Sequence, residues 1–361
     1  MINKNLRFLT AASGLLLLMA CAGPVTLPPQ GSSLEIQQET QRQKEFAYRT
    51  LIEDQDRLFN IAFPILSKNA GFCGKRTAPA FGLTMWNLPR VKQEYRQAAV
   101  GLYNLHATLA VQHVADHSPA SQAGIRSGDL IVAINGRDIE HGWHAAKKAH
   151  EALKLTGYGP AGFLLERQGT LLNITVQPVD SCHYPVQFDQ GDTTVNAFAD
   201  GERIVVAKGA VRFAENDTEL ALMIAHELGH NAMRHIDKKQ SNAMIGTIGG
   251  LAFDAILAAS GVNTGNQIGQ IGQELGAGAH SVAFEQEADY VGMYFMERAG
   301  YNSHGVADFW RRMAAENPKN VNVRGTHPTS PERFLAIERT RKEIIRKKAT
   351  GQPLEPNFQP K

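Results

Sequence analysis

The chain is poor in cysteine and in net charge. It has three cysteines in 361 residues, and 37 lysines and arginines against 35 acids give a formal net charge of +2. Nothing in that balance argues for a nucleic-acid partner. The apolar run nearest the N-terminus, Leu15–Met19, is short for a transmembrane helix. The length leaves room for two domains.

The N-terminus has the pattern of a secretory signal. Lys4 and Arg7 form a short basic start, an apolar run follows, and Leu18–Ala20 leads directly to Cys21. A cysteine in that place favours lipidation, so we expect residues 1–20 to be removed and Cys21 to carry lipid. The alternatives are an ordinary cleaved signal and an uncleaved anchor. Residue 22 is alanine rather than aspartate, which resembles Gram-negative lipoproteins sorted to the outer membrane and facing the periplasm.

The two remaining cysteines are Cys73 and Cys182. Two cysteines in an oxidising compartment predict a disulfide. They bracket the middle of the chain, so the bond would tie together the two ends of an inserted domain.

The most informative motif is His226-Glu227-Leu228-Gly229-His230. Positions four apart lie about 40° apart on one helix face, so both imidazoles can reach one metal ion. Glu227, one step round the helix, can serve as a general base without being a ligand. Residues 216–218 offer N-cap candidates, and good helix formers follow. The alternative is that both histidines are core residues with hydrogen-bond partners and no metal. The glutamate between them argues against it.

A second helical pattern, residues 284–292, supplies a third ligand. Glu285 and Asp289 lie four apart on one face. Glu285 would complete the two-histidine, one-glutamate set of a catalytic zinc, one ion per chain. Asp289 would accept a hydrogen bond from the far nitrogen of a ligand histidine. Glu287 is about 200° round the helix from Glu285 and is expected to point elsewhere. A solvated acidic helix face is the alternative, but the neighbours are apolar.

Together these motifs resemble the zinc endopeptidases of the HtpX and BepA type, which are related to the CAAX prenyl proteases. The resemblance covers about residues 184–345 and includes Gly325–Pro328. It implies a gluzincin fold in which His226, His230 and Glu285 hold zinc and Glu227 is the catalytic base. In some relatives a histidine in the position of His327 closes the zinc site. A loop residue before proline is the other interpretation.

The oxyanion of peptide hydrolysis needs a further donor besides the metal. His327, His235 and Tyr290 are candidates that the sequence does not rank. Residues 193–207 alternate enough to form a strand, and its edge could hold a substrate extended.

The middle of the chain carries a second pattern. Ser118–Gly136 predicts a short helix closed by Gly124, an apolar strand and an Asn-Gly hairpin turn. Ala145–Leu155 would be a second helix, and Gly162–Val179 two strands. This segment resembles a PDZ domain, which implies binding of peptide termini by strand addition. Gly101–Asn104 is a candidate carboxylate loop. The alternative is a small β-rich spacer.

Between the two metal-site helices, residues 241–282 are apolar, with only Asp254 and Glu274 as acids. Such a segment could cross a membrane in integral relatives, but Asp254, Gly261 and the polar residues 263–273 argue against a span. We expect a mobile lid or groove wall over the zinc. The alternative is a helical hairpin buried in the core.

The expected fold class is α+β: a mainly helical gluzincin-type domain with a small sheet, plus a PDZ-like β-rich domain. In chain order, the expected divisions are a signal 1–20, a tether 21–34, an N-terminal helical region 35–94, a PDZ-like domain 95–181, a zinc protease domain 182–348, and a tail, 349–361, without fixed structure. Val306–Glu316 and Pro331–Lys348 are predicted helices.

The preferred function is a lipid-anchored periplasmic zinc endopeptidase acting on misfolded or unassembled envelope polypeptides. The competitor is a chaperone or assembly factor that binds partners through its PDZ-like domain and keeps a latent zinc site. Glu227 favours the enzyme, because a pure binder has no use for a base beside the metal. A structural zinc site fits poorly, since such sites usually close around four ligands, often cysteines.

Overall fold

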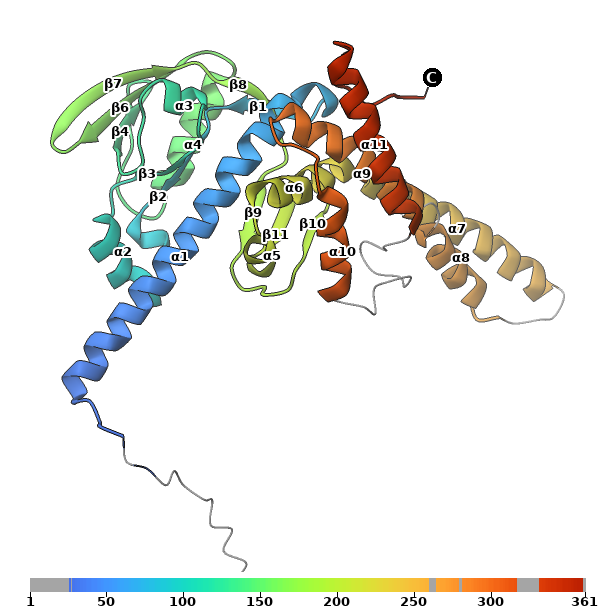
Figure 1. Ribbon diagram of the computed structural model, residues 1–361, viewed down its shortest axis with the longest axis horizontal. Helices are drawn as coiled ribbons and strands as arrows, with labels where there is room; N and C mark the ends of the chain where they lie inside the picture. Colours follow the sequence, from blue (N-terminus) through green and yellow to red (C-terminus); the bar gives the residue numbers. More distant parts are fainter. Residues whose placement is uncertain (1–25, 27, 260–263, 279–280, 317–330, 360–361) are drawn as a thin grey trace, which may run out of the picture. The chain divides into compact units, whose positions relative to one another are not determined.

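The computed structural model describes residues 26, 28–259, 264–278, 281–316 and 331–359 (Figure 1). Cys21, the signal and His327 lie outside the described residues. The chain divides into two units, residues 1–42 and 43–361, and the architecture below is that of the second. Its fold is α+β, as predicted.

Eleven α-helices and eleven strands lie within the described residues. The helices are α1 Ser33–Lys68, α2 Arg96–Tyr103, α3 Pro119–Gln122, α4 Ala145–Thr156, α5 Lys208–Phe213, α6 Asp217–Ala232, α7 His235–Ala259, α8 Gln267–Gly278, α9 Ser281–Arg298, α10 Val306–Glu316 and α11 Pro331–Ala349. The strands are β1 Thr77–Ala80, β2 Leu83–Trp86, β3 Ala110–Val114, β4 Leu130–Ile134, β5 Arg137–Asp138, β6 Ala161–Arg167, β7 Thr170–Val176, β8 Val179–Cys182, β9 Val186–Asp189, β10 Ala197–Ala199 and β11 Ile204–Ala207.

One hydrophobic core joins α6 and α9 with the C-terminal half of α1, the small β9–β11 sheet, α10 and α11. The α6 helix is buried over almost its whole length, from Leu220 to Asn231. It begins as the sequence predicts: the Asn216 side chain accepts a hydrogen bond from the backbone N–H of Glu219 at 3.1 Å. It ends before Arg234, whose φ of 58° turns the chain into α7.

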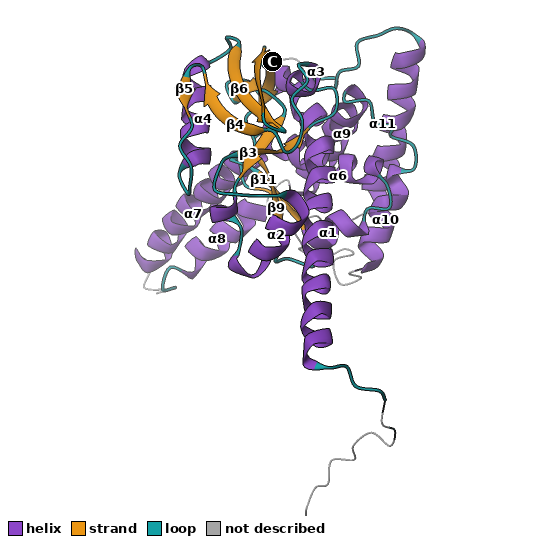
Figure 2. Cartoon of the chain, turned by 90° about the vertical axis from the view of Figure 1, so that its left-hand side faces the viewer, coloured by secondary structure: helices purple, strands orange, loops and turns teal. Residues whose placement is uncertain are grey.

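A second core belongs to the predicted PDZ-like segment. Its six-stranded sheet has the order β2-β3-β4-β6-β7 (Figure 1), with β5 paired to β4 (Figure 2). Asn135 and Gly136 both have positive φ, which forms the predicted hairpin turn between β4 and β5. The buried face of α4, through Ala145, Ala149 and Ala152, packs against this sheet. The predicted helix and strand pattern is confirmed here.

Two expectations about this part of the chain were wrong. Residues 35–94 were expected to be helical, but they include β1 and β2, and β2 extends the PDZ-like sheet by pairing with β3. The candidate carboxylate loop, residues 101–104, is instead the end of α2, closed by Asn104 with a φ of 48°. Leu102 and Tyr103 pack toward α1, so burial of the apolar side chains outweighs the loop pattern.

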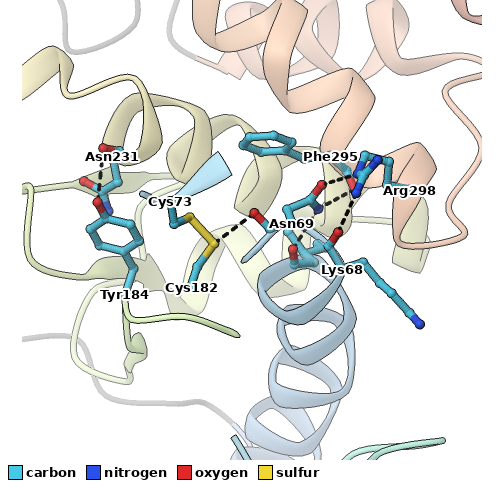
Figure 3. Close-up of a disulfide and its surroundings, with 9 residues drawn as sticks. Lys68, Asn69, Cys73, Cys182, Tyr184, Asn231, Phe295 and Arg298 are labelled. Atoms are coloured by element: carbon cyan, nitrogen blue, oxygen red, sulfur yellow. Dashed lines mark hydrogen bonds between the residues drawn. A yellow bond between two sulfur atoms is a disulfide. The ribbon is translucent and has the colours of Figure 1, made fainter. Parts of the chain in front are cut away.

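The PDZ-like segment enters and leaves through one pair of strands. Strand β1 pairs antiparallel with β8. Cys182, the last residue of β8, forms a disulfide with Cys73, and their Cα atoms are 5.6 Å apart (Figure 3). Beside it, the Asn69 side chain donates to the backbone oxygen of Phe295 at 3.0 Å and accepts from Arg298. These contacts hold the end of α1 against α9.

The small sheet has the order β10-β11-β9, with β11 parallel to β9 and antiparallel to β10. Residues 193–207 therefore form a hairpin rather than one strand. The Asp200 side chain accepts backbone hydrogen bonds from Glu202 and Arg203, which makes the turn. Within the described residues β10 is an edge of this sheet. Asn231 of α6 accepts from Gly201 N–H and donates to the Arg203 carbonyl, fixing the hairpin beside the helix.

The C-terminal tail is ordered through residue 359, contrary to expectation. The Lys347 ammonium donates to Asn357 at 2.9 Å, and the backbone N–H of Asn357 donates to the Tyr290 hydroxyl at 2.9 Å. Phe358 stacks on Phe72 with ring centroids 6.2 Å apart. These side-chain contacts fix a segment whose proline content alone suggests disorder.

The segment between α6 and α9 is a helical hairpin of α7 and α8, and Figures 1 and 2 both show the two helices side by side. It is not buried in the core: only 11% of the most apolar window of α7 is buried. With a mean hydropathy of 1.4 over that window, α7 is long and apolar enough to cross a membrane by length and composition alone.

Candidate metal centre

The site forms where α6 and α9 cross at very short range. A Cβ added to Gly229 would lie 3.1 Å from the Ala288 carbonyl oxygen, and one added to Gly292 would lie 3.0 Å from His226 N and Cα. Glycine at these two positions lets the backbones touch. The side chains of His226, His230 and Glu285 therefore converge from two helices on one buried point.

The spacing of the donor atoms fits a tetrahedral zinc ion. The Nε2 atoms of His226 and His230 are 3.1 Å apart, and each lies 3.3 Å from a carboxylate oxygen of Glu285. A tetrahedral ion with bonds of about 2.0 Å places its donors about 3.3 Å apart. The three side chains are at most 4% exposed. Two imidazoles and one carboxylate form the donor set of a catalytic zinc with an open fourth position.

The charges around the candidate metal position also favour a bound cation. Glu227, Glu285 and Asp289 are each no more than 2% exposed, and the neighbouring base is Arg333, itself 2% exposed. Its guanidinium binds Asp289 through two hydrogen bonds of 2.8 and 2.9 Å and lies 3.6 Å from Glu285. Within the described residues, three buried carboxylates face one guanidinium, and the excess of negative charge can be neutralised by a proton on His226 or by a divalent ion in its place.

Asp289 lies behind His226 as predicted, with its carboxylate 3.0 Å from Nδ1. Burial opposes ionisation of Asp289, but the Arg333 guanidinium and the His226 ring lower the pKa of its carboxyl group. Burial likewise disfavours a charged His226, but Asp289 and Glu285 raise its pKa to about 10. With Nε2 bound to a metal, Nδ1 would keep its proton and donate to Asp289, which fixes the ring.

His230 has its own support, which the sequence did not reveal. Its Nδ1 lies 2.9 Å from Nδ1 of His235, and Nε2 of His235 lies 2.8 Å from the Glu287 carboxylate. Burial lowers the pKa of His235 despite Glu287, which favours a neutral ring. Such a ring can accept a hydrogen bond from His230 at Nδ1 and donate one from Nε2 to Glu287. Glu287 points away from the metal position as predicted, but it takes part through His235.

Glu227 is buried at the centre, 2% exposed, on the helix that carries both histidines. Two of the three candidate oxyanion donors, His235 and Tyr290, are engaged with other side chains. His235 is held behind His230 by the hydrogen bonds to His230 and Glu287, and the Tyr290 hydroxyl lies 2.9 Å from the Glu343 carboxylate. His327 lies outside the described residues.

Sequence reasoning missed Arg333 and Trp310. The Trp310 and His226 rings are in edge contact, with centroids 5.1 Å apart, and Cζ of Arg333 lies 5.5 Å from the Trp310 ring centroid. Arg333 is in the first turn of α11, 44 residues after Asp289. The only available signal was a basic residue at the apolar start of a predicted helix, which is weak.

Comparison with known proteins agrees with this geometry. Residues 170–341 match peptidase family M48, and residues 111–156 match the PDZ domain. The chain therefore resembles M48 peptidases in its C-terminal half and PDZ domains in its middle segment. The M48 match contains all three candidate ligands and Glu227, and both resemblances drawn from the sequence are confirmed.

The individual relatives match only part of this chain. The beta-barrel assembly-enhancing protease of Escherichia coli O157:H7 is 29% identical over 164 residues, which is 42% of this chain and 33% of the relative. The mitochondrial metalloendopeptidase OMA1 of Schizosaccharomyces pombe is 30% identical over 165 residues, 44% of this chain and 48% of the relative. The serine protease Do-like HtrA of Bacillus subtilis is 33% identical over 84 residues, 23% of this chain and 18% of the relative. The chain thus spans less than half the length of these curated relatives.

Proposed function

We propose that this protein is a zinc-dependent endopeptidase. The observation that carries the proposal is the buried cluster of His226, His230 and Glu285, with donors 3.1–3.3 Å apart and Glu227 on the same helix. The M48 match supports peptide hydrolysis rather than another metal-dependent reaction.

The residues of the site have distinct roles in the proposed hydrolysis. Zinc bound there would polarise the scissile carbonyl and make water a nucleophile near neutral pH. Glu227 takes the proton of the attacking water and later delivers it to the leaving amine. Asp289 and the His235–Glu287 pair hold the two histidine rings in the orientation that ligation requires.

Substrate would lie along the edge strand β10. Because Asn231 fixes the β10–β11 turn to α6, this edge stays beside the metal helix. An extended polypeptide can pair with such an edge through its backbone, which suits unfolded chains of varied sequence. We infer that the PDZ domain selects these chains by binding peptide termini.

We also propose a place in the cell envelope. The lipobox at Cys21 would anchor the chain to the periplasmic side of the outer membrane, and a disulfide between Cys73 and Cys182 suits that oxidising compartment. Substrates would then be misfolded or unassembled envelope proteins. Replacing Cys21 with serine should weaken membrane attachment and remove the lipid from the N-terminal peptide in mass spectrometry. Unchanged membrane attachment and peptide mass would contradict the anchor.

The catalytic proposal is tested by cleavage of an unfolded protein. We expect wild type to cleave it and Glu227→Gln to bind zinc without cleaving. Glu274→Gln, an exposed glutamate on α8, is the matched control and should cleave like wild type.

A His327→Ala variant belongs in the same assay. Activity that rises above wild type would support a closed resting site. If both wild type and His327→Ala are inert, the chaperone alternative replaces the enzyme.

A further inference from the structure

A broad face of α7 is apolar and exposed over more than three turns. The residues concerned share helical spacing and outward orientation: Met244 65%, Ile245 68%, Ile248 61%, Leu251 42%, Phe253 54% and Ile256 62% exposed. Ala252, Ala255 and Ala259 lie among them and are also exposed. No other described helix carries so dense a group of exposed large apolar side chains.

The opposite face of α7 is fully used by α8. A Cβ added to Gly250 would lie 2.3 Å from the Ile268 carbonyl oxygen, and one added to Gly269 would meet the Leu251 side chain at 2.7 Å. The two helices therefore touch through small residues, as helix pairs in lipid do. The exposed apolar face of α7 is therefore not the surface that α8 covers.

The α7–α8 hairpin exposes apolar side chains mainly on α7 and polar side chains mainly on α8. The exposed residues of α8 include Gln267, Gln270, Gln273 and Glu274, with Ile271 as the apolar exception. A hairpin that spans a membrane would need apolar surface on both helices. Among the side chains that the structure describes, all the exposed large apolar ones of this hairpin except Ile271 are on α7, the distribution of a helix that lies at an interface.

The apolar face is also free of charge. From residue 240 to residue 273 the only ionisable side chain is Asp254, and it is 4% exposed, hydrogen-bonded to Thr264 and to the backbone N–H of Gly269. A protein interface usually has a polar rim that forms hydrogen bonds. A face with its single charge satisfied inside the hairpin suits lipid, where an unsatisfied polar group is most costly.

We propose that α7 inserts its exposed face into one leaflet of a phospholipid bilayer, with α8 toward water. From Met244 to Ile256 the apolar face is about 18 Å long at 1.5 Å per residue. That is shorter than the hydrocarbon core of about 30 Å, so the helix lies in the interface and does not span it.

The start of α7 fits the headgroup layer. Lys238 is exposed and comes between one and two turns before the apolar face. It lies 3.7 Å from the Glu287 carboxylate and can also meet anionic phosphates. Lys239 beside it is half-buried. The acids beside them are engaged within the protein: Asp237 pairs with Arg234 at 2.8 Å, and Glu287 with His235 at 2.8 Å. His235 is the first residue of α7, so insertion would place the metal centre close to the membrane surface.

The test uses the full chain carrying Cys21→Ser, so that no lipid contributes, and vesicles of phosphatidylethanolamine and phosphatidylglycerol. Co-flotation measures binding, and hydrogen exchange of backbone amides locates it. The double variant Ile245→Asp with Ile248→Asp is compared with Leu155→Asp with Leu171→Asp, two residues that are equally exposed outside the hairpin. Each aspartate in the hairpin should weaken partitioning about tenfold or more.

We expect vesicles to slow exchange in residues 243–257, the hairpin variant to lose binding at least tenfold, and the control to bind like the parent. Equal binding by both double variants would overturn the proposal. So would a dimer, seen by sedimentation without vesicles, that the hairpin aspartates abolish, because the face would then join two copies. Glu227→Gln should bind vesicles while failing to cleave peptides, so membrane binding and catalysis fail separately.

Discussion

At the scale of single residues, the site is a set of ligands held by residues that are not ligands. His226 is backed by Asp289, and His230 by His235 and Glu287. The two supports differ in burial: Asp289 is 2% exposed, while the Glu287 side chain is 41% exposed. That difference predicts unequal effects on metal affinity.

Asp289→Asn should weaken zinc binding about tenfold to a hundredfold, because the variant loses the charge that fixes the His226 ring. Competition with a chromogenic chelator measures the affinity. Asp308→Asn, on the exposed side of α10, is the control and should bind zinc like wild type. An Asp289→Asn protein with wild-type affinity would remove Asp289 from the account.

Glu287→Gln should lower zinc affinity less than Asp289→Asn does. Its carboxylate acts through His235, and water screens a side chain that is 41% exposed. The same chelator competition compares the two variants side by side. An equal or larger loss in Glu287→Gln would mean that His235 needs its partner more than the geometry indicates.

At the scale of helices, the position of the metal depends on how closely α6 approaches α9. Gly229 and Gly292 face the other helix at distances where a methyl group would require movement. Gly249, on α7, has nothing within 4 Å of its Cβ position. Alanine variants at these positions therefore separate the effect of close helix approach from the low helix propensity of glycine.

Gly292→Ala should lower the free energy of unfolding by about 1–3 kcal/mol, because the added methyl overpacks the crossing, and should weaken zinc binding. Gly249→Ala should instead stabilise the helix by up to about 1 kcal/mol. Denaturant unfolding gives both values. Destabilisation of the same size in both variants would show that the α6–α9 crossing accommodates a methyl group without overpacking.

Local patterns predicted the helices better than the connections between them. The spacing of His226 and His230 placed both rings on one face of a helix, since helix geometry depends only on neighbours. Glu285, on a separate helix, was expected from the ligand set of a catalytic zinc. The β10–β11 hairpin was missed because its turn is made by the Asp200 side chain, a single polar residue within an alternating segment. Arg333 was missed because its role depends on how α11 packs against α9, which no local pattern encodes.

At the scale of the molecule, the PDZ-like segment is an insertion tied at its base. Strands β1 and β8 pair where it begins and ends, and the disulfide closes a loop with a sequence separation of 109 residues. The sequence predicted this bond from the count of cysteines and the compartment. It could not predict that β1 and β8 would pair beside the bond.

Replacing both Cys73 and Cys182 with serine should lower the free energy of unfolding by about 2–5 kcal/mol, because a loop of this length gains much entropy when unlinked. Denaturant unfolding under oxidising conditions measures the change. The single variant Cys21→Ser is the control and should unfold like wild type. No difference in the double variant would show that β1, β8 and the core hold the base without the bond.

The central claim is that one zinc ion, held by His226, His230 and Glu285, makes this chain an endopeptidase. The most direct measurement is cleavage of an unfolded protein by metal-free chain as zinc is added stepwise. We predict that cleavage is absent at first, rises with zinc and stops rising at one equivalent, while Glu227→Gln binds the same single equivalent and remains inactive. Cleavage that survives removal of the metal, or that is equal in Glu227→Gln, would contradict the account.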